Sequence, residues 1–482
     1  MTGVQTCALP ICQQLHARTA AALAERSPDL IESQPELLAH HLTEAGAADE
    51  AVSYWLKAGK RSLERSALRE AVSHLRHGLQ LLGAMAATPL NTERRLQFMV
   101  LLGPALISLS GPGSTEVEDL YAVAFDVCQK APESDHHFAV YWGWWRVARD
   151  YKDRKSRADA LLTRAEASRH SDLILQAHHC QWASQFDLGD LAACSCHIHK
   201  GLDIYAQGDF RDHAALYGNH DAKVCGHGEL ALVSWLQGHA ELALTEERKS
   251  AAWASELAHD GSIGHAMDIA LMHRFYRREA RQVLARADAM IRFAEEKGFA
   301  DYASKGQLFQ GWARAVLGDP GGGLELFQRG LALQKQIGTM EDFPVYYCML
   351  AELLERAGKP DEALSETAAA QTLLEKAGLV MWMPELQRRR GELILRVNPQ
   401  DADAAQAAFA QALHSAAAQG AKPLELRAGL NIARLRRSSG DDAGATDMIT
   451  ALLAAYPPGA ETGDVKNAKL FLAAYGAQSG VA

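Results

Sequence analysis

A turn followed by a small, a large and a small residue on one helix face recurs along this chain, and the pattern limits the folds that the chain can adopt. In GKPDEALSETAAAQTLL, Gly358 is followed by Ala363, Thr367 and Ala370. The last three share one face of a helix, because residues three or four positions apart are neighbours there. Small side chains let a partner helix approach closely, and the residue between them fills the space toward the next helix pair. The pattern predicts helix pairs stacked in an array.

The same frame fits four more segments of the chain. They are Gly46, Ala51, Trp55 and Ala58; Gly189, Cys194, Ile198 and Gly201; Gly318, Gly323, Phe327 and Gly330; and Gly440, Ala445, Ile449 and Leu452. Two positions depart from the frame, since Thr367 is not large and Leu452 is not small. In this order of turn, small, large and small residues the chain resembles tetratricopeptide (TPR) proteins.

The spacing of the turns also indicates an array. The predicted turns are separated by 36, 49, 40, 40, 40, 42 and 40 residues and lie at Asp153, Gly189, Gly238, Arg278, Gly318, Gly358, Gln400 and Gly440. HEAT and armadillo repeats measure about 40–47 residues and TPR repeats about 34, so length alone favours the former. The residue frame favours TPR, with each helix about one turn longer. The step of 49 indicates an insertion before Gly238.

We therefore expect an all-α fold, namely a TPR-like helical-hairpin solenoid. It should be a right-handed superhelix with repeats of about 40 residues.

Composition and charge exclude several classes of partner. The chain carries 49 Lys and Arg residues against 59 Asp and Glu residues, a formal net charge of −10, and we expect no nucleic-acid partner. No apolar run reaches the about 18 residues of a membrane-spanning helix, so we expect no membrane partner. Outside residues 1–11, seven cysteines show no Cys-x-x-Cys pair, which favours reduced thiols and a cytoplasmic location.

The opening residues MTGVQTCALPIC show no pattern typical of a helix or a strand. Residues 1–11 match, position by position, the translation of a short-read sequencing adapter from a GTG start, and Cys12 agrees with the leftover base. We therefore expect residues 1–11 to be an adapter-derived artefact, and the coding sequence to be cut upstream. We expect weak placement up to about Cys12 and a first helix from about Gln13, with a partly exposed face of Leu15, Thr19, Ala22 and Leu23.

The rest of the chain is divided by pattern into three parts. Residues 12–34 are expected to be a helical remnant of an upstream junction, residues 35–460 the solenoid, and residues 461–482 a capping helix and tail. Within the last part, the helix is expected over 462–475.

An aromatic segment, YWGWWRVARDY, holds the first candidate contacts. Trp142 and Trp145 are spaced for the core, whereas Trp144 lies off that face and could anchor a partner. Arg149 is a second candidate contact in the same segment. Packing in the core remains the alternative for Trp144.

The inserted segment, LYGNHDAKVC, holds the other candidate contacts. They are Tyr217, His220, Asp221 and Cys225. Loops carry function more often than regular elements do. The alternative is a loop that serves the fold alone, because His-Asp-x3-Cys matches no known metal-ligand spacing.

A second cluster of metal-ligating residue types lies around the turn at Gly189. A helix that folds back there would bring His179 and Cys180 level with Cys196 and His199, residue types that zinc uses. Cys194, however, fills the small position of the frame, where cysteine acts as a small apolar residue. We therefore favour packing, and expect no metal and no cofactor in this chain.

One long stretch goes beyond a generic TPR pattern. Residues 14–82, which include QPELLAHHLTEAG, resemble a bacterial family of large signalling ATPases. The phrases GPALISLSGPGSTEVEDLYAVA, YWGWWR, LYGNHDAKVC and MPELQRRRGELIL also resemble that family, over nearly all of residues 13–456. Its members often carry an N-terminal adenylate or guanylate cyclase domain, then a P-loop ATPase of the signal-transduction (STAND) type, then a long TPR region.

The resemblance implies that this chain is the sensor or interaction region of a truncated signalling ATPase or cyclase. It would bind a protein partner, its own upstream domains or an inducer, and bias the missing catalytic part. None of the family's catalytic motifs occurs here, so we expect no catalytic residues and no enzymatic activity in this chain. The alternative is a small-molecule receptor module of a transcriptional-activator-like ATPase with a similar plan.

Overall fold

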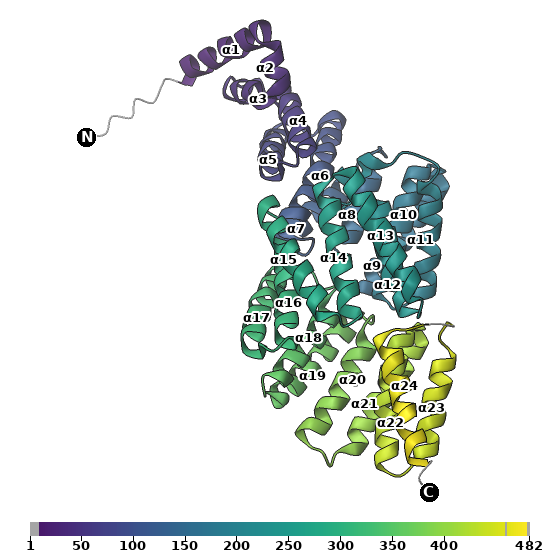
Figure 1. The fold of residues 1–482 in the computed structure, drawn as a ribbon. Coiled ribbons are helices and arrows are strands. Elements are labelled where there is room, and N and C mark those ends of the chain that lie inside the picture. The colour runs from purple at the N-terminus through teal and green to yellow at the C-terminus, as the bar shows by residue number, and fades with distance from the viewer. Residues whose placement is uncertain (1–8, 458–459, 480–482) are drawn as a thin grey trace, which may run out of the picture. The chain divides into compact units, whose positions relative to one another are not determined.

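The computed structural model describes residues 9–457 and 460–479, and over these residues the chain is all-α with one short 3₁₀ helix (Figure 1). The described residues form two compact units. One comprises the chain up to Val147 together with Ala215–Asn219, and the other comprises Ala148–Ala214 and the chain from His220 onward. The predicted solenoid of residues 35–460 contributes to both units.

The helices of the first unit come from the N-terminal third of the chain. They are α1 (Leu9–Arg26), α2 (Pro28–Ser33), α3 (Pro35–Glu44), α4 (Ala48–Glu64), α5 (Leu68–Ala84), α6 (Pro89–Ser110), α7 (Thr115–Lys130) and α8 (His137–Arg146).

The second unit holds the remaining α-helices. They are α9 (Tyr151–Ser168), α10 (Ser171–Asp187), α11 (Leu191–Tyr205), α12 (Ala222–Leu236), α13 (Ala240–Leu257), α14 (Asp260–Tyr276), α15 (Ala280–Lys297), α16 (Ala300–Val316), α17 (Pro320–Ile337), α18 (Phe343–Arg356), α19 (Pro360–Ala377), α20 (Met383–Val397), α21 (Ala402–Gln419), α22 (Lys422–Ser438), α23 (Asp442–Ala454) and α24 (Gly463–Ser479). The 3₁₀ helix η1 (Arg211–Ala215) lies in the predicted insertion between α11 and α12.

Left-handed residues end the helices at intervals of 20 residues, which confirms the period of about 40 per helix pair. The series is Arg278, Gly298, Gly318, Gly338, Gly358 and Gly378, with φ between 61° and 116°. A positive φ reverses the chain after a helix, and glycine adopts it at little steric cost. The predicted turn at Asp153 is wrong, because Asp150 caps α9 and Asp153 lies in its first turn.

The small-large-small frame is buried as predicted. Gly323 of α17 faces Gly311 of α16 so closely that a Cβ atom at Gly323 would lie 2.5 Å from the carbonyl oxygen of Gly311. Leu452, the large residue in a small position, is only partly buried, and its side chain occupies the space over Gly429 of α22. The exception is therefore accommodated by a missing side chain on the facing helix.

Within the second unit, aromatic and polar contacts join helices that are far apart in the sequence. Tyr276, the last residue of α14, stacks on Trp382 with ring centroids 4.0 Å apart, and the ring of Trp235 of α12 lies 5.4 Å from that of Tyr276. Arg427 of α22 donates a 2.9 Å hydrogen bond to the backbone oxygen of Tyr276, 151 residues away in the sequence. The solenoid of this unit therefore curls until its inner helices share a packed interior.

The two ends of the described chain differ in how they match the expectations. Helix α1 begins at Leu9 and not near Gln13, because Pro10 lies in the first helical turn, where a missing N–H costs nothing. The expected weak placement falls largely on residues 1–8, outside the described residues. Leu15 is exposed as expected. Helix α24 confirms the predicted terminal helix.

The cysteines follow the expectation in part. Six of them are not joined in disulfides, namely Cys128, Cys180, Cys194, Cys196, Cys225 and Cys348. Cys12 is disulfide-bonded, so the expectation of a reduced thiol was wrong there. Residue spacing does not exclude a single bridge.

No helix among the described residues has the length and apolar character needed to cross a membrane.

Candidate ligand-binding site

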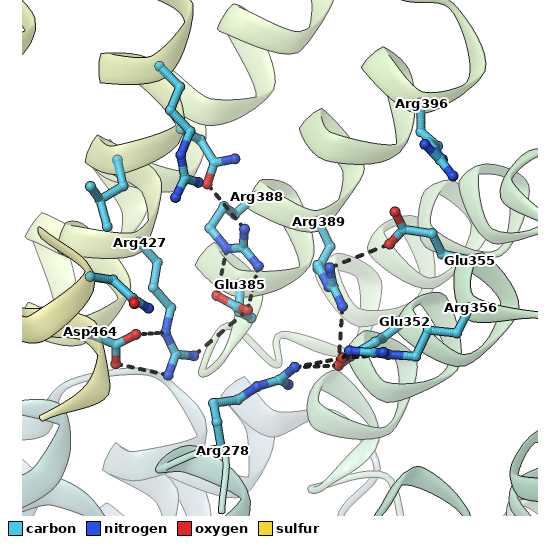
Figure 2. Close-up of a pocket in the computed structure, with 14 residues that line it drawn as sticks. Arg278, Glu352, Glu355, Arg356, Glu385, Arg388, Arg389, Arg396, Arg427 and Asp464 are labelled. Atoms are coloured by element: carbon cyan, nitrogen blue, oxygen red, sulfur yellow. Dashed lines mark hydrogen bonds and ion pairs between the residues drawn. The ribbon is translucent and has the colours of Figure 1, made fainter. Parts of the chain in front are cut away.

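An arginine-rich pocket opens in the second unit, between the inner helices α18, α20 and α22 and the start of α24 (Figure 2). Its volume is about 570 Å³. Seven arginines and four carboxylates line it, which leaves a formal surplus of three positive charges. The lining residues are Arg278, Glu352, Glu355, Arg356, Glu385, Arg388, Arg389, Arg396, Arg427, Leu430, Asn431, Arg434, Asp464 and Asn467.

Glu352 of α18 is the acceptor at one side of the pocket. Arg278 donates to both of its oxygens at 2.7 Å, and Arg356 donates at 3.0 Å and 3.1 Å from one turn further along α18. Arg389 of α20 forms an ion pair with it at 3.1 Å, and the indole of Trp312 donates at 3.0 Å. One buried carboxylate thus orders three guanidinium groups.

Glu385 and Asp464 order the arginines at the other side. Arg388 donates to the two oxygens of Glu385 at 2.8 Å and 3.0 Å. Arg427 donates to the two oxygens of Asp464 at 2.8 Å and 3.0 Å, and lies 3.8 Å from Glu385 (Figure 2). Two-point pairing of this kind fixes the plane of each guanidinium as well as its position.

The arginines keep the pocket carboxylates ionised. Burial alone would raise the pKa of Glu385, but the charges of Arg388 and Arg427 outweigh burial and lower the pKa to about 2. The pKa of Glu352 is also held well below its ordinary value, since Arg278 and Arg389 outweigh its burial. These pairs therefore stabilise the fold above about pH 4.5, and their contribution is lost as the pH falls toward 2.

Two arginines of the pocket form no hydrogen bond or ion pair with other described residues. Arg396 lies near the end of α20 and Arg434 on α22, and both side chains are exposed. Figure 2 shows Arg396 apart from the paired arginines. The surplus positive charge of the pocket is therefore presented to solvent, where a ligand with several negative charges can reach it.

The candidate contacts predicted from the aromatic segment lie elsewhere. Trp142 and Trp145 are fully buried, which confirms them as core residues. Trp144 is partly buried and stacks on Phe125, with ring centroids 5.1 Å apart. Arg149 is exposed and precedes α9.

The candidates in the insertion have different surroundings. Tyr217 is buried, 5.7 Å from Trp142 between ring centroids. Asp221 is fully buried and caps α12 through the N–H groups of Lys223 and Val224, while its carboxylate also accepts hydrogen bonds from Tyr205 and Trp253. These bonds give Asp221 a role in the fold.

The predicted meeting of His179 and Cys180 with Cys196 and His199 does not occur. Cys196 and His199 are exposed on α11, and His199 bonds to the backbone oxygen of Ser195. His179 instead faces His220, with their Nε2 atoms 3.3 Å apart. The structure thus brings together members of the two clusters that the sequence kept separate.

The arginine-rich pocket was missed in the sequence. A signal was present in MPELQRRRGELIL, where three consecutive arginines occur in a helix of the repeat pattern. Arg388 and Arg389 of that run face neighbouring helices. Because arginines are almost never buried unless they are paired, the run indicates acidic partners on those helices.

The chain is similar in sequence to an uncharacterized protein of Rhizobium meliloti (strain 1021), with 32% identity over 418 residues. The match covers 86% of this chain and 40% of that protein, so the chain spans less than half the length of its relative. No protein-family model matches the chain.

Two solved structures are similar to the chain. A Rap protein complexed with competence and sporulation factor superimposes with a TM-score of 0.54 at 14% identity, covering 77% of this chain and 99% of that one. A Rap conjugation gene regulator of the plasmid pLS20, in complex with the Phr* peptide, gives a TM-score of 0.47 at 10% identity, covering 77% of this chain and 96% of that one. The first similarity shows that the described helices form a TPR-like repeat fold.

Proposed function

We propose that this chain is a ligand-sensing arm that recognises an acidic segment of a protein partner in the arginine-rich pocket. The observation that carries the proposal is the surplus of three positive charges in a 570 Å³ pocket whose acidic side chains are already paired. Guanidinium groups held in fixed planes match carboxylates in a two-point geometry. A segment with several carboxylates would satisfy Arg396 and Arg434 together.

The packed interior of the second unit favours binding of a few residues of a partner over binding of a long extended peptide. Trp235, Tyr276 and Trp382 pack against one another between the inner helices. Arg427 crosses to the backbone of Tyr276 and occupies further space there. The pocket at the C-terminal end of this packed interior therefore offers room for a few residues of a partner.

The solved Rap structure accords with a binding role for this fold. That protein was solved as a complex with competence and sporulation factor, and its TM-score against this chain is 0.54. By the same reasoning we propose that a bound segment shifts this chain between conformations and so acts on other parts of a larger protein.

The larger protein would be a signalling ATPase or nucleotide cyclase, of which this chain is the repeat region. The resemblance of residues 14–82 supports this assignment, and the match to 40% of a longer relative accords with it. The chain itself would contribute binding and not catalysis. Reading the genomic DNA upstream of codon 12 tests the assignment: an open frame that encodes a P-loop supports it, and an in-frame stop codon directly upstream contradicts it.

A small anionic molecule is the second candidate ligand, because the pocket volume falls within the range of about 300–1,000 Å³ that small-molecule sites occupy. Titration calorimetry separates the two candidates. A hexaglutamate peptide should bind and a hexalysine peptide should not, if the pocket takes an acidic segment. Binding of ATP or a cyclic nucleotide, without binding of hexaglutamate, would favour the small-molecule receptor.

A further inference from the structure

Three side chains of residue types that bind transition metals converge at the end of the inserted segment. They are His179 of α10, His220 just before α12, and Cys225 in the first turns of α12. One ligand atom from each lies within 4.8 Å of the others. His179 and Cys225 are buried, and His220 is partly buried.

The start of α12 explains why His220 and Cys225 meet. Asp221 is the N-cap of that helix, so His220 precedes the cap and Cys225 is the fourth residue after it. Side chains at these two positions contact each other across the first helical turn, as in the hydrophobic staple. The spacing is therefore set by helix capping, and the buried carboxylate of Asp221 holds it.

The partners of His179 present the correct nitrogen to His220. The Nδ1 atom of His179 lies 3.3 Å from the amide oxygen of Gln176, one turn earlier in α10. A proton on Nδ1, donated to that oxygen, leaves the lone pair on Nε2, which faces His220. Metal-binding histidines in proteins have their second nitrogen fixed in this way.

Ring stacking fixes the planes of both imidazoles. His179 stacks on Trp182, with ring centroids 4.7 Å apart, and His220 stacks on His265 at 4.2 Å. The two histidines are thus held from the sides while their Nε2 atoms face each other. Such support outside the ligand set is what keeps a metal site in shape.

The distances fit zinc. Two nitrogens at about 2.0–2.1 Å from a tetrahedral ion are about 3.3–3.4 Å apart, and the observed Nε2–Nε2 distance is 3.3 Å. A sulfur and a nitrogen on the same ion are about 3.6 Å apart, and the ligand atoms lie within 4.8 Å of one another, so each sulfur–nitrogen distance needs to shorten by no more than about 1.2 Å.

We propose that His179, His220 and Cys225 form a zinc-binding site that ties the end of the inserted segment to α10. Two imidazoles and a thiolate suit Zn²⁺ and not Mg²⁺ or Ca²⁺, which prefer oxygen ligands. Three protein ligands leave the fourth position of the ion to water or to an external ligand. The proposal replaces the expectation, drawn from spacing alone, that the chain binds no metal.

The experiment is titration of the chelator-treated full chain with Co²⁺, followed by absorption and by metal analysis after desalting. We expect one equivalent to bind His179, His220 and Cys225 with a thiolate-to-cobalt band in the near ultraviolet. Cys225→Ala should abolish the band, and His220→Gln should weaken binding at least about tenfold. Cys196→Ala removes an exposed thiol outside the cluster and should leave the band unchanged.

A second histidine cluster requires its own control. His16, His40 and His41 also have ligand atoms within 4.8 Å of one another, but no thiol. The variant H40A/H41A should retain the near-ultraviolet band of the wild-type chain. Zn²⁺ should also raise the Tm of the wild type and not of Cys225→Ala, which tests the site even if one variant is poorly folded.

Three results would overturn the proposal. They are the absence of bound Co²⁺ or Zn²⁺ at micromolar concentration, a near-ultraviolet band that persists in Cys225→Ala, and metal binding that disappears only in H40A/H41A.

Discussion

Arg278 donates hydrogen bonds of 2.7 Å to both carboxylate oxygens of Glu352, which follows it by 74 residues in the sequence. Arg278 also stands where the 20-residue series of left-handed turn residues otherwise has glycine, with φ of 61°. Its guanidinium lies 4.9 Å from the ring centroid of Trp312. A turn position that locally favours glycine is therefore occupied by an arginine whose side chain lines the arginine-rich pocket.

Two replacements of Arg278 separate the strain of its left-handed backbone from the stabilisation by its ion pair with Glu352. Arg278→Gly should change the free energy of unfolding by less than about 1 kcal/mol, because relief of the left-handed strain offsets loss of a partly exposed ion pair. Arg278→Ala keeps the strain and loses the pair, so it should be less stable than Arg278→Gly by about 1 kcal/mol. Urea denaturation measures both, and an alanine variant as stable as the glycine variant would contradict a strained turn.

Neutralising Glu352 should have opposite effects on folding and on anion binding. Glu352→Gln leaves three guanidinium groups without their shared carboxylate, and should lower the free energy of unfolding by about 1–3 kcal/mol. It also adds one positive charge to the surplus, so an anionic peptide should bind more tightly. Denaturation and calorimetry measure the two quantities on the same sample.

Glu355→Gln is the matched control for that change. Glu355 contacts Arg389 only at 3.6 Å and is partly exposed. Its replacement makes the same change in charge and should affect the stability less than Glu352→Gln does. Weaker anion binding in both variants would show that the surplus charge does not attract the ligand.

Glu229 should make the fold less stable as the pH rises. Burial raises the pKa of Glu229 to about 8, together with the nearby carboxylates of Asp187 and Asp342. Its buried Oε2 atom has no hydrogen-bond partner among the described residues. Between about pH 4.5 and pH 8 the folded chain holds a proton that the unfolded chain has released, so stability falls through this range.

Glu229→Gln should remove that part of the pH dependence. At pH 8 the variant should be more stable than the wild type by about 4 kcal/mol, and near pH 5 the difference should be within about 1 kcal/mol. Thermal melts from pH 5 to pH 8 measure it. Glu241→Gln, at an exposed carboxylate of α13, should keep the wild-type profile; equal slopes for all three proteins would rule out Glu229 as the source.

Removal of residues 1–11 should leave the Tm within about 2 °C of that of the full chain. Among the described residues removed, Pro10 and Ile11 are exposed. Deletion through Arg26 is the comparison, because it also removes buried Ala20 and the His16–His41 contact, and it should lower the Tm of the first unit. A loss of several degrees on removing residues 1–11 alone would mean that this segment packs as a native part of the protein.

Residue spacing was sufficient for the fold because each repeat depends on contacts within about 40 residues. Ala363, Thr367 and Ala370 are all buried as the frame predicts. The turn at Arg278 was also placed correctly from the period alone, although arginine is not a turn residue by preference.

The candidate sites depend on contacts that spacing does not define. Arg278, Glu352 and Asp464 reach one pocket only because the solenoid curls, so that Tyr276 of α14 stacks on Trp382, more than 100 residues later in the sequence. The sequence predicted that His179 would meet Cys196 and His199 on the facing helix of its own hairpin. Its observed neighbour, His220, comes from the inserted segment. The curvature of the solenoid thus brings the arginine-rich pocket together, and the capping of α12 places His220 beside Cys225. Both are properties of the folded chain.

Titration of labelled hexaglutamate measures whether the surplus arginines of the pocket bind an anionic segment. Arg396→Ala combined with Arg434→Ala should weaken binding at least about tenfold, corresponding to about 1.4 kcal/mol, without loss of thermal stability. Arg281→Ala, at an exposed arginine of α15 outside the pocket, should leave the affinity unchanged. Equal affinity of the wild type and the double variant would contradict the claim.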